Sequence, residues 1–307
     1  MCTIGSAFFD FDNRKVQSIF KQCDVFSLDT EFLKPEVKKD ANTGISYVPF
    51  TRVDGDKRPA WAGINEYGVC YVAVDSYIDE NKADAFRYSG AVDSSVFDMY
   101  LKIISSYKNA KDAVKMAKAF YETQKYAELP TDILLISDAE NMYFIETLDG
   151  RVRIIHRESG HFASTNHCRT FVEAIPYEQN HSTYLRLDRT EKILQGKPNV
   201  EGMGDVLRDS YYGKTSWSVC RYAYISDFDE ASKSEVDKTI KEGLYFSRGA
   251  VIFNIKSGTT ENEKPEIVCE YVINNNASVK NVGYVWKPFS ESEPQNVEYI
   301  GKFSNIV

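Results

Sequence analysis

The run Met1-Cys2-Thr3-Ile4-Gly5 opens the sequence and leads directly into the apolar, β-prone segment Thr3–Phe11. Cysteine is small enough for methionine aminopeptidase to remove Met1, which would leave Cys2 as the first residue. That residue would carry both a thiol and a primary amine, whose reference pKa is about 7.7–8.0. Because such an amine can act as the base for its own thiol, the run predicts an N-terminal cysteine nucleophile on a first strand. A chance cysteine in a strand is the alternative.

The composition is that of an acidic globular chain. Of the 307 residues, 43 % are hydrophobic and 27 % are charged, the net charge is −8, and no basic block is sustained. These values predict that neither nucleic acid nor an anionic membrane is a partner. No apolar run approaches the roughly 18–20 residues that span a bilayer, and no basic and apolar leader precedes Cys2. We therefore expect a protein without a membrane span.

Cysteine and histidine usage gives no indication of a metal. The six cysteines show no CxxC spacing, and the four histidines form no HxxxH or HxxE pattern. This predicts a cytoplasmic protein with reduced thiols, no metal and no cofactor. Cys23, Cys70 and Cys220 lie in apolar, strand-like runs, where we expect them to be buried as small hydrophobic side chains. The oligomeric state stays open, with a homo-oligomer among the alternatives.

Hydrophobic periodicity predicts a strand-rich chain in which Asp12-Asn13 and Asn65-Glu66-Tyr67-Gly68 are turns. The expected strands are Thr3–Phe11, Lys15–Leu28, Trp61–Ile64, Val69–Val74, Ile133–Ile136, Met142–Glu146, Val152–His156, Trp217–Tyr224, Ala250–Ile255, Ile267–Ile273 and Val282–Trp286. The expected helices are a segment capped by Ser94 or Ser95 and reaching Ile104, then about Ala110–Tyr126, Thr183–Leu194, Gly202–Asp209 and Glu230–Ile240. This order implies layered α+β packing rather than βαβ repetition. Without a linker or an internal repeat, the simplest organisation is a single domain over residues 1–307.

Several short motifs follow one another within residues 1–255. They are Met1-Cys2-Thr3, Phe20-Lys21-Gln22-Cys23-Asp24, Gly63-Ile64-Asn65-Glu66-Tyr67-Gly68-Val69, Ser137-Asp138-Ala139, Tyr143-Phe144-Ile145-Glu146, Ser164-Thr165-Asn166-His167, Ser182 through Arg186, and Leu207-Arg208-Asp209. In this order they resemble the N-terminal nucleophile hydrolases of the choloylglycine hydrolase and penicillin acyltransferase type. Acid ceramidase and the N-acylethanolamine amidases are more distant members. The Thr-Asn-His and Leu-Arg-Asp runs favour the penicillin acyltransferase branch.

The resemblance implies a fold and a set of site residues. The expected fold is a four-layer αββα sandwich with two stacked antiparallel sheets. Cys2 corresponds to the nucleophile, and its freed amine to the proton shuttle. Asp24 corresponds to the carboxylate that holds this amine, and Asn166 to the donor of an amide hydrogen to the tetrahedral oxyanion. Arg186 corresponds to an arginine that organises the site through charge pairing.

Two positions depart from the pattern of the family. Asp75 stands where relatives often place Asn or Tyr at the oxyanion hole, and an ionised carboxylate there would repel an oxyanion. Either the backbone N–H of Asp75 does this work, or the correspondence is displaced by one or two residues. Lys21 replaces an arginine that relatives carry three positions before the orienting Asp, and it lacks the planar fork of arginine. It can act as a point charge that favours the Cys2 thiolate, with Arg14 as a sequence-near alternative.

Together these residues imply hydrolysis of a linear amide bond in a small-molecule acyl amide, through a thioester on Cys2. Acyl transfer to an amine, a non-catalytic ligand-binding protein of the same fold, and a peptidase with a Cys–His pair that uses His167 are the alternatives. One further group of residues would either line an acyl pocket or belong to the core. Its members are Tyr211, Tyr212, Trp217, Tyr222 and Tyr224.

Overall fold

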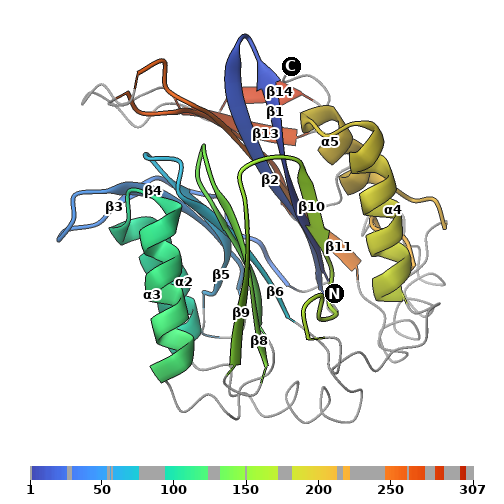
Figure 1. Ribbon diagram of the computed structural model, residues 1–307, viewed down its shortest axis with the longest axis horizontal. Coiled ribbons are helices and arrows are strands. Elements are labelled where there is room, and N and C mark those ends of the chain that lie inside the picture. Colours follow the sequence, from blue (N-terminus) through green and yellow to red (C-terminus); the bar gives the residue numbers. More distant parts are fainter. Residues whose placement is uncertain are drawn as a thin grey trace.

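Two antiparallel sheets of seven strands each form the centre of the molecule (Figure 1). The computed structural model describes residues 2–25, 30–53, 56, 58–75, 94–123, 132–148, 151–171, 182–212, 217–221, 246–260, 263–273, 281–286 and 298–301. The first sheet has the order β10-β1-β2-β11-β12-β13-β14, and the second has the order β3-β4-β5-β6-β7-β8-β9. The N-terminal strand therefore lies inside the first sheet, flanked on both sides.

The strands of the first sheet are β1 (Cys2–Phe11), β2 (Arg14–Val25), β10 (His161–Ser164), β11 (Phe246–Lys256), β12 (Glu266–Ile273), β13 (Asn281–Trp286) and β14 (Glu298–Gly301). Those of the second are β3 (Lys38–Lys39), β4 (Ser46–Thr51), β5 (Ala60–Asn65), β6 (Cys70–Asp75), β7 (Asp132–Ser137), β8 (Met142–Leu148) and β9 (Arg151–Arg157). The described helices are α2 (Ser94–Ser106), α3 (Ala110–Thr123), α4 (Ser182–Gly196) and α5 (Val200–Arg208). In Figure 1, α2 and α3 cover the outer face of the second sheet, and α4 and α5 cover that of the first.

The hairpin of β1 and β2 sets the register of the first sheet. Its two loop residues, Asp12 and Asn13, both have positive φ angles, of 56° and 57°. Two left-handed residues between paired strand ends match a type I′ turn, whose twist suits that of the flanking strands. The register that follows from this turn places Cys2 directly opposite Cys23.

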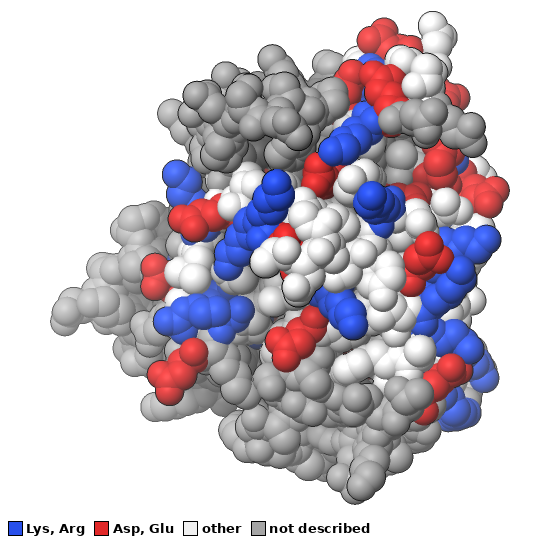
Figure 2. All heavy atoms as spheres, turned by 90° about the vertical axis from the view of Figure 1, so that its left-hand side faces the viewer, with Lys and Arg blue, Asp and Glu red and all other residues white. Residues whose placement is uncertain are grey.

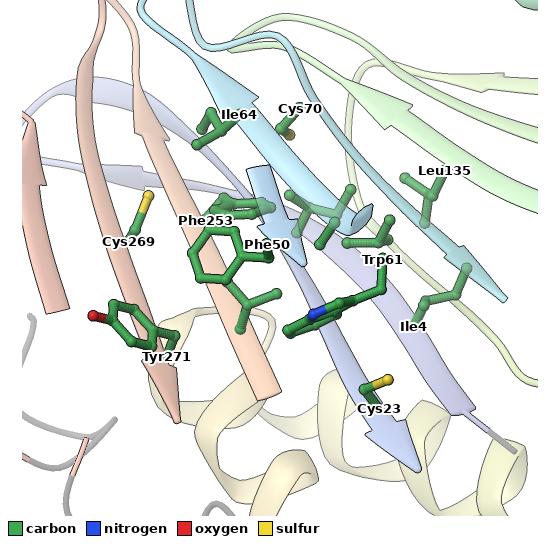
Figure 3. Packing of buried hydrophobic residues seen from close by; sticks show 14 of the residues in the cluster. Ile4, Cys23, Phe50, Trp61, Ile64, Cys70, Leu135, Phe253, Cys269 and Tyr271 are labelled. Atoms are coloured by element: carbon green, nitrogen blue, oxygen red, sulfur yellow. The ribbon is translucent and has the colours of Figure 1, made fainter. Parts of the chain in front are cut away.

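Three hydrophobic clusters hold the layers together. The largest lies between the two sheets, where Phe50 packs edge-on against Trp61, Phe253 and Tyr271 at ring-centroid distances of 5.4–5.7 Å (Figure 3). A second cluster joins α2 and α3 to the second sheet, and a third joins α4 and α5 to the first. Burying apolar side chains on both faces of each sheet is what fixes four layers. The αββα sandwich expected from the sequence is confirmed.

Most expected elements are present, with boundaries that differ by a few residues. The second helix is described to Thr123 and β2 to Val25, so the ends expected at Tyr126 and Leu28 lie outside the described residues. Strands β3, β4, β10 and β14 were not expected from the sequence. The strand expected over Trp217–Tyr224 is wrong in its described part, because residues 217–221 are turn and irregular backbone. The helix expected over Glu230–Ile240 lies outside the described residues, and the single-domain organisation stays a prediction.

The surface of the helical face formed by α2 and α3 carries both charge signs. Figure 2 shows acidic and basic side chains interspersed there, with no continuous basic stripe on the described part of this face. Some are neighbours along α3, where Lys115 pairs with Asp112 and Lys118 pairs with Glu122. Among the described helices, none is long and apolar enough to cross a membrane.

A buried glutamate on β12 yields a prediction about stability. Its neighbours Cys269 and Tyr271 face the inter-sheet core, so alternation points Glu270 to the helix-covered face of the sheet. Glu270 is 1 % exposed, and neither carboxyl oxygen has a hydrogen-bond partner in the described structure. Burial raises its pKa to about 9, against the opposing charge of Arg208. A carboxylic acid that stays neutral at pH 7 is therefore expected here.

Glu270→Gln should remove a pH-dependent loss of stability. The folded state holds the proton of the Glu270 carboxyl more tightly than the unfolded state does. The stabilisation that this proton gives is therefore complete at pH values below the pKa of the unfolded chain. It is lost as the pH rises from about 4.3 towards about 9. Between pH 5 and pH 8 we expect the variant to gain on the order of 4 kcal/mol relative to the wild type. Urea unfolding at both pH values measures this, with the exposed Glu266→Gln as control. Parallel pH profiles for Glu270→Gln and the wild type would contradict the assignment.

Candidate active site

Strand pairing brings Asn166 to the start of β1. Strand β10 runs antiparallel to β1 with Ile4 opposite Ser164, so the two residues after Ser164 lie beside the first residues of β1. The Cys2 nitrogen donates a hydrogen bond of 2.9 Å to Asn166 Oδ1, and both residues are buried. Asn166 is fixed in turn, because its backbone N–H donates to Thr183 Oγ1 at 3.1 Å. The nucleophile candidate and the oxyanion candidate are thus neighbours despite a separation of 164 positions.

Arg186 ties these two residues together from helix α4. Its Nη1 donates to the Cys2 carbonyl oxygen at 2.6 Å and to Thr3 Oγ1 at 2.9 Å, and its Nη2 donates to Asn166 Oδ1 at 2.9 Å. The guanidinium is fully buried. Its planar arrangement of N–H donors suits several acceptors at once. Arg186 therefore fixes the backbone of Cys2 and the side-chain amide of Asn166 in one arrangement.

Asp24 belongs to a second buried network on the same side of the sheet. Its Oδ1 accepts a hydrogen bond of 2.7 Å from Ser247 Oγ, and its Oδ2 lies 3.5 Å from Arg221 Nε. Arg221 Nη2 also donates to Ser182 Oγ at 2.9 Å, and Arg186 Nε reaches that hydroxyl at 3.3 Å. Ser182 thus joins the two arginines. Burial raises the pKa of Asp24, and the charge of Arg221 opposes this.

The Cys2 thiol faces the inter-sheet core together with Cys23. A hydrogen bond with the Cys23 thiol lowers the pKa of Cys2 well below its ordinary value, against burial, which raises it. The positive charge of Lys21 lowers it further, as does a backbone hydrogen bond from Asp24. The pKa of Cys23 is raised, first by the same hydrogen bond and then by burial. Of the two thiols, Cys2 is the one that these surroundings favour as a thiolate.

Lys21 is a buried cation held by backbone carbonyls. Its Nζ donates to the carbonyl oxygens of Trp61, at 3.2 Å, and Ala73, and it lies 5.5 Å from the centre of the Trp61 ring. These contacts anchor the ammonium between β2 and the facing sheet. Its effect on the Cys2 thiol is that of a fixed point charge.

Lys21→Met should raise the pKa of the Cys2 thiol. Methionine has a similar length and can pack against Trp61, but it removes the positive charge that favours the thiolate. We expect the pH profile of Cys2 alkylation by iodoacetamide to move to higher pH. The exposed Lys197→Met is the matched control and should leave the profile in place. Unchanged profiles for both variants would show that Lys21 does not act on Cys2.

Arg14, the alternative cation considered from the sequence, is wrong for this role. It lies at the turn end of the β1–β2 hairpin, where it pairs with Glu266 at 2.8 Å and binds the Ser257 carbonyl. The side chain of Asp75 lies outside the described residues, although its backbone ends β6 opposite Asp132. Neither residue is therefore placed in the site by the structure.

Two side chains of the aromatic group are exposed, and His167 lies beside two threonine hydroxyls. Tyr211 and Trp217 are 66 % and 52 % exposed, so the alternative that placed them in the core is wrong for these two residues. Tyr222 and Tyr224 lie outside the described residues. His167 is buried, with its Nδ1 within 3.1 Å of Thr165 Oγ1 and 2.9 Å of Thr183 Oγ1, and its ring lies against Tyr184.

Sequence reasoning missed Arg221 and Ser247 as parts of this arrangement, and it named Ser182 only as the start of the motif that reaches Arg186. Arg221 offered a signal, because a lone arginine in the apolar run Ser218-Val219-Cys220-Arg221-Tyr222 needs a buried partner. Ser247 offered none, since single serines are common throughout the chain. The burial of Cys23, Cys70 and Cys220 is confirmed. Within the described residues no group of three His, Cys, Asp or Glu side chains is arranged to hold a metal.

An αββα sandwich with a cysteine as the first residue of an inner strand is the arrangement expected of N-terminal nucleophile hydrolases and acyltransferases. The sequence agrees with this class. The chain belongs to the acyl-coenzyme A:6-aminopenicillanic acid acyl-transferase family, whose model matches residues 61–230. The matched region contains Asn166, Arg186 and Arg221, whereas Cys2 and Asp24 precede it. No curated protein sequence matches the chain.

Solved structures similar to this one include two hydrolases. The C2A mutant of the conjugated bile acid hydrolase from Clostridium perfringens has a TM-score of 0.41 and 10 % identity, and the match covers 96 % of this chain and all of that one. The Caenorhabditis elegans ortholog of N-acylethanolamine-hydrolyzing acid amidase has a TM-score of 0.45 and 10 % identity, with 82 % of this chain and 92 % of that one covered.

Proposed function

We propose that this protein cleaves a linear carbon–nitrogen amide bond in a small-molecule acyl amide, with Cys2 as the nucleophile after removal of Met1. The observation that carries the proposal is the hydrogen bond of 2.9 Å between the Cys2 nitrogen and Asn166 Oδ1, inside a buried site that Arg186 closes. In the chain as translated, this nitrogen belongs to the peptide bond between Met1 and Cys2. Removal of Met1 converts it into a primary amine with a usable lone pair.

The first step is activation of the thiol. The neutral α-amine of Cys2 takes the proton of its own thiol, directly or through one water molecule. The positive charge of Lys21 and the hydrogen bond with Cys23 both favour the thiolate that results. The sulfur then attacks the carbonyl carbon of the amide, and the carbonyl oxygen becomes an oxyanion.

Asn166 is the residue that we assign to this oxyanion. Its Oδ1 accepts hydrogen bonds from the Cys2 nitrogen and from Arg186, which fixes the orientation of the carboxamide. The Nδ2 group is then the donor for the oxyanion. A preorganised donor of this kind is worth about 2.7–4 kcal/mol of transition-state stabilisation. Arg186, Arg221 and Asp24 hold Cys2 and the residues around it in position.

Collapse of the tetrahedral intermediate completes acylation. The C–N bond breaks, the protonated α-amine returns its proton to the leaving amine, and the acyl group stays on Cys2 Sγ as a thioester. Water, deprotonated by the same α-amine, then hydrolyses the thioester. An amine that attacks in place of water would give acyl transfer instead, and membership of an acyl-transferase family favours this as the second candidate function.

Mass spectrometry of the purified protein and a substrate panel test the proposal. The expected result is a mature chain that begins at Cys2 and that turns over at least one of penicillin V, bile-salt conjugates, N-acyl amino acids or short acyl peptides. Rapid alkylation at Cys2 relative to the other five thiols is expected as well. An active protein that retains Met1 contradicts the mechanism. Equal alkylation rates without turnover would favour a ligand-binding protein, and inactivation by His167→Ala with Met1 retained would favour a Cys–His peptidase.

A further inference from the structure

A second cysteine lies directly opposite the nucleophile on the neighbouring strand. Cys2 and Cys23 are paired residues in the register of β1 and β2, and both side chains belong to the cluster between the sheets. Figure 3 shows Cys23 directed into the same inter-sheet space as Ile4 and Trp61. Directly opposed residues of antiparallel strands have Cα atoms about 4.5 or 5.5 Å apart. Both values fall within the roughly 4.4–6.8 Å that a disulfide spans.

The two thiols contact each other, and their pKa values are shifted in opposite directions. They share a side-chain hydrogen bond, which favours the thiolate at Cys2 and the protonated thiol at Cys23. Lys21 provides a positive charge for both, and Arg52 provides one for Cys23. A reactive thiolate beside a second thiol is the arrangement of peroxide-sensitive cysteine pairs. Cys23 is fully buried, and its part in the amide cleavage described above is limited to the hydrogen bond that favours the Cys2 thiolate.

We propose that Cys23 is a resolving thiol, and that Cys2 and Cys23 form a reversible disulfide that switches the nucleophile off under hydroperoxide stress. The inference rests on the proposed function in one respect: if an acyl amide can reach the Cys2 sulfur, so can the much smaller hydrogen peroxide.

The reaction balances with hydrogen peroxide as the oxidant. The Cys2 thiolate attacks one peroxide oxygen, so a sulfur–oxygen bond forms, the oxygen–oxygen bond breaks, and the released hydroxide takes up a proton to give water. Cys23 then attacks the sulfenic sulfur of Cys2. The sulfur–sulfur bond forms, the sulfur–oxygen bond breaks, and a second water molecule leaves with the proton of Cys23. The two thiols lose two electrons, which reduce the peroxide.

Peptide mapping of peroxide-treated protein tests the proposal directly. The mature full-length chain is treated with hydrogen peroxide, blocked with iodoacetamide and digested with trypsin. Because Arg14, Lys15 and Lys21 lie between the two cysteines, the disulfide would join two separate peptides, of residues 2–14 and 22–38. We expect this crosslinked pair, a mass lower by two hydrogens, and a loss of amide turnover that dithiothreitol fully restores.

Two variants complete the test. In Cys23→Ser, which keeps a hydroxyl donor but has no resolving sulfur, peroxide should oxidise Cys2 to the sulfinic acid, and dithiothreitol should restore no activity. Cys269→Ala removes another buried thiol from the same sheet and should behave as the wild type. Absence of the crosslink, a crosslink to a different cysteine, or full recovery of Cys23→Ser by dithiothreitol would overturn the proposal. Because the crosslink is read by mass, it is informative even if no amide substrate is turned over.

Discussion

Replacing Asn166 by aspartate should lower kcat for amide cleavage about 100- to 1000-fold, the range observed for loss of one oxyanion donor. Aspartate retains a carboxyl oxygen that can accept the hydrogen bonds from the Cys2 nitrogen and from Arg186, now at Asn166 Oδ1. It replaces the Nδ2 donor by a negatively charged oxygen, which repels the oxyanion. The variant thus separates the two roles of Asn166, which are to hold Cys2 and to stabilise the transition state.

Steady-state kinetics with an amide from the substrate panel measures the loss, and iodoacetamide alkylation reports separately on Cys2. We expect alkylation to persist in Asn166→Asp, since the thiol and its amine are unchanged. Asn254→Asp is the matched control, because Asn254 is also buried but binds Ser18 on the part of the sheet away from Cys2. It should keep kcat within about twofold per folded molecule. Wild-type kcat in Asn166→Asp would remove Asn166 from the oxyanion site.

The elements that the sequence predicts well are those whose signal is local. The apolar runs on either side of Asp12-Asn13 and the turn Asn65-Glu66-Tyr67-Gly68 specify their hairpins without reference to the rest of the chain. Helix α3 is similarly visible, because small and apolar residues recur on one face. Strand β10 was missed because four residues, His161–Ser164, are too few for a period-two pattern, and only pairing with β1 makes them a strand.

The candidate site depends on strand β10. The sequence could therefore name residues of the site, but it could not predict how these residues contact one another. Asn166 could be named from a motif, but its position beside Cys2 follows from the pairing of β10 with β1. Arg186 could also be named, whereas its bonds to the Cys2 carbonyl and to Asn166 depend on how α4 packs against the sheet. Arg221 could not be assigned, because its partner Asp24 is almost 200 positions away in the sequence.

Arg186→Met should lower the free energy of unfolding by on the order of 3–5 kcal/mol and should reduce amide turnover below detection. Four buried acceptors lose the hydrogen bond that Arg186 donates: the Cys2 carbonyl, Thr3 Oγ1, Asn166 Oδ1 and Ser182 Oγ. Asn166 Oδ1 keeps the bond from the Cys2 nitrogen, and Ser182 Oγ keeps the bond from Arg221. Each buried polar group left without a partner costs about 1–3 kcal/mol, and part of this cost is recovered when the site relaxes. We expect amide turnover to be lost even in molecules that remain folded, because Arg186 then holds neither the Cys2 backbone nor the Asn166 amide in place.

Urea unfolding and kinetics on the same preparations separate these two effects. Arg186→Lys keeps the charge but offers fewer donors in a different geometry, so we expect it to recover more of the stability than of the turnover. Lys192→Met removes an exposed cation from the same helix and should change stability by no more than about 0.5 kcal/mol. If Arg186→Lys regained turnover fully, charge alone would account for the role of Arg186. If Arg186→Met were as stable as Lys192→Met, the bonds from Arg186 to Cys2 and Asn166 would not hold the site together.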